Sequence, residues 1–268
     1  MITAIGSKKG GVGKTTTAVN LAAAVAEVGH RVLLVDLDSQ ASASLSLGVD
    51  RAHLAPSVAD VLFWQMPALE AIRRTSVPRL DLLTASADLV RADVELGAYR
   101  HGERRLRSVL EGPALQYDHV FLDCPPGLSL VPVNALAAAD ALLVPIEPQF
   151  LALAGVQSML AAAERVRASY NRNLGLLGIL LTRVDYRTRD TRMNVERIRA
   201  EHGPRVMGVE VRINIRLAEA PAAAQTIFQY DPTATGAGAY RLVAEEFLMR
   251  AKRLAERPPE PIEVGAVR

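Results

Sequence analysis

The stretch Lys8-Lys9-Gly10-Gly11-Val12-Gly13-Lys14-Thr15-Thr16 decides the fold of this chain. It follows a short apolar run, residues 1–6, that predicts a buried strand, and it precedes residues 17–28, whose alanine and apolar positions predict a helix. A glycine-rich turn between a strand and a helix is suited to bind phosphate. Its glycines let backbone N–H groups converge on the phosphate oxygens, and the helix N-terminus adds its dipole.

The loop departs from the common phosphate-loop pattern G-x-x-x-x-G-K-[ST], because Lys8 stands where the first glycine belongs. It fits instead the variant x-K-G-G-x-x-K-[ST], in which Lys9 is a second lysine. Three of the chain's four lysines lie in this loop, whereas the chain has 27 arginines. Because a compact ammonium fits among phosphates more easily than a planar guanidinium, this favours a phosphate site over an ordinary glycine-rich turn.

Four side chains are candidates for the chemistry of this site. Lys14 is expected to reach the β- and γ-phosphates, and the Thr15 hydroxyl is expected to ligate Mg²⁺. Asp38 follows an apolar strand predicted at residues 31–37, and acids at the carboxyl edge of a parallel sheet face the ligand crevice. Asp38 could instead cap the next helix.

The second candidate acid, Asp123, ends the apolar strand predicted at residues 119–123. This is the Walker B form, in which an aspartate at a strand end holds the hydration shell of Mg²⁺. Cys124 follows it and could be interpreted as a nucleophile. The nearest histidine, His119, stands at the far end of the same predicted strand and Pro125-Pro126 indicates a rigid turn, so a structural role is favoured.

The composition allows one large α/β domain. A chain of 268 residues can bury a full core, and 50% hydrophobic residues with only 4% aromatics are typical of helix-covered parallel sheets. The net charge of +2 and the pI of 8.8 do not by themselves indicate a nucleic-acid partner. The single cysteine fits a reducing cytoplasm. The longest apolar region, Leu128 to Ile146, contains Pro132 and Asp140, so no membrane span is expected, nor is a signal peptide.

Strands and helices are predicted to alternate, which indicates a single doubly wound α/β domain with a mostly parallel central sheet and helices on both faces. The domain is expected to span residues 1–256, followed by a disordered Pro-rich tail at residues 257–268. The predicted strands are residues 1–6, 31–37, 80–84, 119–123, 141–146, 174–182 and 206–211, and the longer predicted helices are 17–28, 88–100, 103–110, 151–170 and 236–254.

The densest basic run lies at residues 183–199, which hold six arginines. A solvated helix face explains such a run as well as a binding surface does, and charge alone leaves both interpretations open.

Six motifs together resemble the ParA/Soj partition ATPases, within the deviant-Walker group that also includes MinD. The resemblance covers the chain from Ile2 to about Ala255. The phosphate loop specifies the wider group, and the fifth of the motifs points to the ParA branch. The matching stretches are Lys9–Ala24 (KGGVGKTTTAVNLAAA), Leu33–Gln40 (LLVDLDSQ), Leu122–Pro126 (LDCPP), Asn134–Leu136 (NAL), Arg216–Pro221 (RLAEAP) and Tyr230–Tyr240 (YDPTATGAGAY).

The resemblance implies a Mg²⁺-dependent ATP hydrolase that closes as a homodimer around ATP. Lys9 would cross to the partner's phosphates, so that charge neutralisation in trans makes ATP the link between the subunits. Asp38 would orient the attacking water, Gly10 would lie where the two loops meet, and Asn214 would contact the adenine. The implied ATP contacts are Lys9, Gly10, Gly11, Val12, Gly13, Lys14, Thr15, Thr16 and Asn214, with Lys9, Lys14 and Asp38 catalytic and with Thr15 and Asp123 at the metal.

The resemblance also implies partners. Family members bind double-stranded DNA without sequence preference as ATP dimers, and a ParB-like protein stimulates their slow hydrolysis. A cytoplasmic, nucleoid-associated protein that segregates or positions a plasmid or chromosome is therefore expected, with no membrane partner. The candidate DNA-binding residues are Arg187, Arg189, Arg192 and Arg216, of which the first and last match basic positions of the family.

Several positions depart from the family pattern near the expected DNA face. The usual Pro-Arg-Asn is Arg212-Ile213-Asn214, the usual Ser-x-Gly-Lys is Ala222-Ala223-Ala224-Gln225, and the basic residues before Gly236 are replaced by Thr233-Ala234-Thr235. Loss of these cations could weaken DNA binding or shift its surface.

Three other functions remain open from the sequence. A ParA-like ATPase could position a non-DNA cargo such as an organelle or a receptor array. A MinD-like membrane regulator would need a C-terminal amphipathic anchor, against which the Pro-rich tail argues. A metal-cluster carrier would need paired cysteines, and the chain has one. An operator-binding repressor is not expected, because no helix-turn-helix precedes the first strand.

Overall fold

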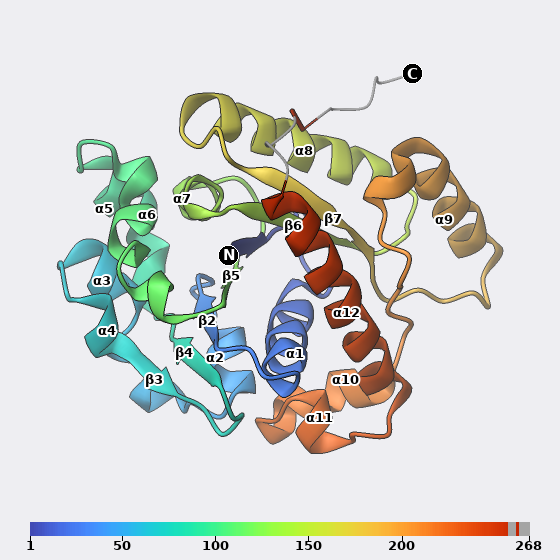
Figure 1. The fold of residues 1–268 in the computed structure, drawn as a ribbon, viewed down its shortest axis with the longest axis horizontal. Helices are drawn as coiled ribbons and strands as arrows, with labels where there is room; N and C mark the ends of the chain where they lie inside the picture. Colours follow the sequence, from blue (N-terminus) through green and yellow to red (C-terminus); the bar gives the residue numbers. More distant parts are fainter. Residues whose placement is uncertain (257–260, 263–268) are drawn as a thin grey trace.

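The computed structural model describes residues 1–256 and 261–262 and has a seven-stranded sheet at its centre (Figure 1). The strand order is β3-β4-β2-β5-β1-β6-β7, and every pair is parallel except β3 with β4. This confirms the predicted single doubly wound α/β domain. The strands are β1 Ile2–Ile5, β2 Val32–Asp36, β3 Ile72–Arg74, β4 Leu80–Leu83, β5 His119–Asp123, β6 Ala141–Ile146 and β7 Gly175–Leu181.

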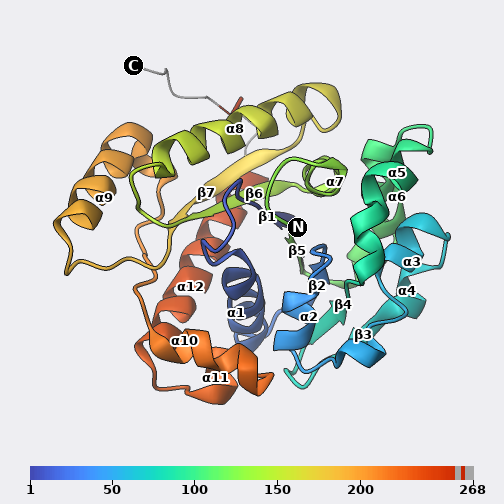
Figure 2. The ribbon, with the colours of Figure 1, turned by 180° about the vertical axis from the view of Figure 1, so that it is seen from behind.

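Helices cover both faces of the sheet, and each face has its own hydrophobic core. In Figures 1 and 2, α1 and α12 lie on one side of the sheet and α7 and α8 on the other. The helices are α1 Lys14–Glu27, α2 Ser42–Ser46, α3 Val58–Phe63, α4 Ala68–Ala71, α5 Ala92–Gly97, α6 Arg105–Leu110, α7 Leu130–Ala138, α8 Ala152–Ser169, α9 Arg189–His202, α10 Ile215–Glu219, α11 Ile227–Tyr230 and α12 Thr235–Ala255.

The register of the central strands brings the functional acids together. β1 lies between β5 and β6, with Ile5 opposite Asp123, and β2 pairs with the other side of β5, with Asp36 opposite Asp123. The chain leaves β1 through α1 and returns to the sheet at β2, one strand beyond β5. The carboxyl ends of β1, β2 and β5 therefore form one edge, where ligands bind in open α/β sheets.

Helix α1 begins three residues earlier than the sequence predicted. Gly13, with φ +81°, is its N-cap and Lys14 is already its first residue. Its small residues pack against α12, where the Thr17 and Tyr240 hydroxyls lie 3.2 Å apart. The phosphate loop thus leads directly into a buried helix, and its lysine is held by helical backbone.

The predicted strand at residues 206–211 is wrong. The segment makes only isolated bridges, of Val206 with Ile179 and of Arg212 with Val184. The amides of Gly208 and Val209 donate instead to the Glu246 carboxylate of α12, at 2.9 Å each. The Met207 and Val211 amides still donate to carbonyls of β7, so a side chain from a distant helix replaces the strand partner only in the middle of the segment.

Three smaller features also differ from the prediction. The short antiparallel edge strand β3 and the helix α7 were not predicted, and the helix predicted at residues 88–100 is a 3-10 turn followed by the six-residue α5.

The predicted disordered tail lies outside the described residues except for residues 261–262. There the Ile262 amide donates to Glu164 of α8 at 2.9 Å, and its side chain is buried.

Candidate nucleotide-binding site

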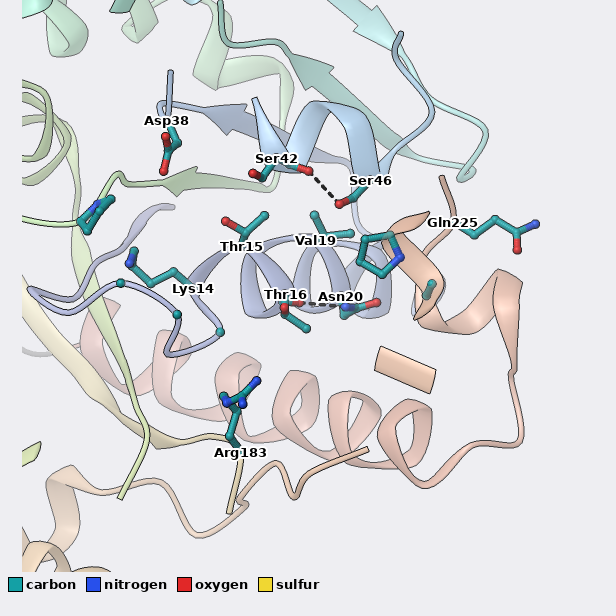
Figure 3. Close-up of a pocket in the computed structure, with 16 residues that line it drawn as sticks. Lys14, Thr15, Thr16, Val19, Asn20, Asp38, Ser42, Ser46, Arg183 and Gln225 are labelled. Atoms are coloured by element: carbon teal, nitrogen blue, oxygen red, sulfur yellow. Dashed lines mark hydrogen bonds between the residues drawn. The ribbon is translucent and has the colours of Figure 1, made fainter. Parts of the chain in front are cut away.

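The phosphate loop opens into a pocket of about 360 Å³ at the carboxyl edge of the sheet (Figure 3). The sequence had indicated the loop and Asp38, and the structure adds walls from α1, α2, the end of β7 and the segment after α10. The lining residues are Gly10, Gly11, Gly13, Lys14, Thr15, Thr16, Val19, Asn20, Asp38, Ser42, Ser46, Pro126, Arg183, Ala220, Pro221 and Gln225.

The conformation of the loop requires its glycines. Gly11 and Gly13 have φ of +76° and +81°, in the left-handed region that residues with a Cβ rarely adopt. The loop is anchored from behind, because the buried Thr182 hydroxyl donates to the Val12 carbonyl at 2.7 Å and also lies 3.0 Å from the Ile146 carbonyl. The loop is therefore held open to phosphate by contacts at the ends of β6 and β7.

Lys14 is the buried cation of the site. Its ammonium donates to the Lys9 carbonyl at 3.1 Å, across the curve of the loop. Burial lowers the pKa of Lys14, while the nearby Asp123 and Asp38 carboxylates favour its charged form. A phosphate bound in the loop would strengthen that preference, because it adds negative charge beside the ammonium.

Asp123 is fully buried at the end of β5, and neither of its oxygens has a hydrogen-bond partner among the described residues. Burial raises its pKa well above the ordinary value, and Asp36 on the neighbouring strand raises it further. The nearby Thr15 hydroxyl lowers the pKa of Asp123 and so offsets part of this rise. It does not form a hydrogen bond with the carboxylate in the absence of a ligand. An unpartnered carboxylate beside a hydroxyl is the oxygen donor set that suits Mg²⁺. These two residues could hold the metal and its water shell.

Two neighbouring groups serve the fold. Asp36 accepts from the Ser44 amide at 2.8 Å and from its hydroxyl at 2.7 Å, and burial raises the pKa of Asp36 to about 6. Cys124 is buried, its thiol donates to the Leu122 carbonyl, and burial raises its pKa. The thiol is thus poorly suited to act as a nucleophile, as the sequence indicated.

Asp38 faces the pocket from the loop after β2, as Figure 3 shows. One of its oxygens accepts from the Gln40 amide at 3.0 Å, and the other has no hydrogen bond among the described residues. The same carboxylate helps to keep Lys14 charged. Its partly exposed position beside the phosphate loop suits a residue that orients water.

Lys9 does not line the pocket of its own chain. It is exposed on the outer side of the loop, where its ammonium donates to the Gln149 side chain. The adjacent Gly10 is also exposed, and a Cβ there would meet nothing within 4 Å. The side chain of Lys9 is therefore accessible to another molecule that covers the pocket, once its ammonium leaves Gln149.

The predicted adenine contact, Asn214, does not line this pocket. Its carbonyl oxygen caps α10 by accepting from the Leu217 amide at 3.2 Å, and its amide donates to the Thr235 hydroxyl at 2.7 Å. The end of the pocket away from the loop is formed by Asn20, Pro221 and Gln225, which the sequence analysis did not single out as ligand contacts.

The four candidate DNA-binding arginines are exposed but do not form one cluster. Arg187 and Arg189 lie at or just before the start of α9, with Arg192 one turn further along it. Arg216 is in α10, and Figures 1 and 2 both show the two helices apart. Arg187 forms a two-bond ion pair with Asp185, and Arg216 pairs with Glu219 at 2.8 Å. Arg189 has no ion pair within residues 1–256.

The loop, the helix that follows it and the two strand-end acids define a P-loop nucleotide-binding protein of the deviant-Walker type. A family model described as "AAA domain" matches residues 1–176. The chain is 46% identical to the chromosome-partitioning ATPase Soj of Thermus thermophilus over 249 residues, which cover 93% of this chain and 96% of that protein. It is 39% identical to the chromosome partitioning protein ParA of Caulobacter vibrioides over 256 residues, covering 94% and 95%. The chain belongs to the ParA/Soj family of chromosome-partitioning ATPases.

A solved structure shares the fold over nearly its whole length. Cobyrinic acid a,c-diamide synthase from Mycobacterium smegmatis superposes with a TM-score of 0.82 at 32% identity, covering 97% of this chain and 98% of that one. That protein was solved with ADP and magnesium and also with an ATP analogue and magnesium. Among the described residues of the present chain, no helix is long and apolar enough to cross a membrane.

The unpartnered Asp123 carboxylate generates a prediction. Asp123→Asn removes a buried carboxylate whose charged form burial disfavours, so the ligand-free protein should lose no stability. ADP should raise the melting temperature of the variant, but adding Mg²⁺ to the ADP-bound variant should raise it no further. Thermal unfolding with no ligand, with ADP alone and with ADP plus Mg²⁺ measures both effects. A less stable variant, or an intact Mg²⁺ effect, would contradict the assignment of Asp123.

Proposed function

We propose that this chain is an ATP-gated DNA-partitioning switch. ATP and Mg²⁺ bind in the pocket, two chains close over them, and the dimer binds DNA without sequence preference. A ParB-like partner then stimulates hydrolysis and releases the dimer, so that a chromosome or plasmid is positioned. The partitioning role of the family members at 39% and 46% identity supports this proposal.

The position of Lys9 is the observation that most supports the proposed dimer. The chain already supplies Lys14 to its own phosphates, and Lys9 projects from the same loop away from them. A cation placed there is suited to reach the triphosphate of another chain that covers the pocket. Because the developing charge of phosphoryl transfer is stabilised by such cations, hydrolysis would then require the dimer.

An exposed apolar pair lies beside this lysine. Phe150 and Leu151 are 81% and 71% exposed, and they directly follow Gln149, which holds the Lys9 ammonium. Large side chains with this exposure are suited to be buried against a partner. Closure of two chains over ATP would cover them and the loop together.

Gly10→Val should separate folding from dimerisation. The position is exposed and an added Cβ meets nothing within 4 Å, so unfolding stability should change by less than about 0.5 kcal/mol. The side chain would stand where two loops approach, so the ATP-dependent dimer should be lost while ADP binding remains. Light scattering or analytical ultracentrifugation with ATP and with ADP measures the dimer.

Gly97→Val is the matched control. Gly97 is an exposed residue of α5, a Cβ there also meets nothing within 4 Å, and the position does not line the pocket. It should dimerise on ATP as the wild type does. A Gly10→Val protein that still dimerises on ATP would remove the proposed closure.

DNA binding tests the other half of the proposal. Affinity for non-specific duplex DNA should be high with ATP, low with ADP, and should fall steeply with salt because bound phosphates release counterions. Arg189→Ala should reduce the salt slope by up to about two per dimer, one for each chain. A fluorescence anisotropy titration across a salt series measures both.

Arg172→Ala is the control for this titration, because Arg172 is exposed just before β7, at the opposite edge of the sheet. It should leave the slope unchanged. An ATP dimer that fails to bind DNA would contradict DNA partition and favour a protein or membrane matrix.

A further inference from the structure

Arg183 is the second cation that lines the nucleotide pocket, and nothing above assigns it a role. It lies two residues after the end of β7 and directly follows Thr182, whose hydroxyl anchors the phosphate loop. Figure 3 shows its side chain reaching toward the pocket from the side opposite Asp38 and Ser42. Arg183 therefore approaches the ligand from a direction that no other charged lining residue occupies.

The backbone at Arg183 is in an unfavourable conformation. Its φ is +52°, in the left-handed region that glycine adopts freely and arginine does not. The neighbours hold it there, because the Thr182 amide donates to the Ile146 carbonyl at 2.8 Å and the Val184 amide to the Val211 carbonyl at 3.1 Å. A strained residue fixed beside a ligand pocket is a candidate for a functional position.

The guanidinium of Arg183 is only loosely engaged. Its single ion pair within the described chain joins Nε to Glu147 Oε1 at 3.4 Å, and its side chain is 55% exposed. Both terminal nitrogens therefore remain available, and these form the planar fork that matches two phosphate oxygens. By contrast, Arg187 already uses two nitrogens on Asp185.

We propose that Arg183 is a nucleotide-contacting residue that binds the phosphate nearest the ribose, and that Glu147 holds its guanidinium when the pocket has no ligand. Asp38 and the Mg²⁺ acid Asp123 mark the terminal-phosphate end of the site. Because Arg183 enters from the other side of the loop, it meets the part of the phosphate chain that ATP and ADP share. It adds positive charge that Lys14 alone does not supply.

The inference rests on nucleotide binding at this pocket, as the proposed function does, and adds a residue to it. Arg183→Gln should weaken ATP and ADP binding by a similar factor, about 10- to 100-fold, because a charge-assisted hydrogen bond to both is lost. Glu147→Gln should tighten both, because it removes the competing carboxylate. Isothermal titration of the full chain with Mg²⁺-ADP and with a non-hydrolysable ATP analogue measures these affinities, and Arg172→Gln should match the wild type.

A third variant separates binding from a structural role. Arg183→Gly relieves the left-handed strain, so it should melt no lower than the wild type while it loses the same affinity as Arg183→Gln. Unchanged ADP affinity in both variants, a loss confined to the ATP analogue, or a loss that follows a lowered melting temperature would each overturn the assignment of Arg183. A wild type that binds neither nucleotide would instead overturn the proposed function.

Discussion

The buried carboxylate of Asp123 is the constraint on which the site depends. A carboxylate placed inside the sheet without a hydrogen bond destabilises the fold, and the parallel register sets a second acid, Asp36, directly beside it. The fold provides Asp36 with hydrogen bonds from the Ser44 amide and hydroxyl, whereas Asp123 is left for a ligand. Lys14 and Thr15, the first residues of α1, are the groups that face it. The destabilised carboxylate, the loop and the helix N-terminus are thus arranged for a metal–phosphate complex.

The proposed closure of two chains over the nucleotide depends on the same loop. Lys14 serves the phosphates from within, while Lys9 is turned outward to Gln149 and the exposed pair Phe150 and Leu151 stands next to it. One loop therefore carries both an internal cation and an external one. A second chain that covers the pocket would bring its own external lysine to the first chain's triphosphate, which links nucleotide binding to association.

The sequence was sufficient for the central strands and for the phosphate loop, because these are determined by local chemistry. Buried parallel strands are continuously apolar, so β5 and β6 were predicted with their observed bounds. The loop glycines, Lys14 and the strand-end acid Asp123 follow from what a phosphate and its metal require, and the structure brings them together.

Features that depend on distant partners could not be predicted in this way. Residues 206–211 have a strand-like composition, but the amides in their middle, of Gly208 and Val209, donate to Glu246, which lies more than one helix away in the chain. Asn214 was assigned to adenine from the resemblance, and that contact stays a prediction, but its role in capping α10 and holding Thr235 depends on the folded chain. Arg183 was one of six arginines in a basic run, and only its left-handed backbone and its place beside the loop distinguish it.

Complementation between two inactive variants tests the trans role of Lys9 most directly. In a mixture of Lys9→Ala and Asp38→Ala chains, the mixed dimer has one complete site, which combines Asp38 of one chain with Lys9 of the other. Each variant alone should hydrolyse little ATP, and an equal mixture should recover up to about a quarter of wild-type activity, since half of the dimers are mixed. A mixture that stays as inactive as its components, although both chains bind ATP, would contradict the account.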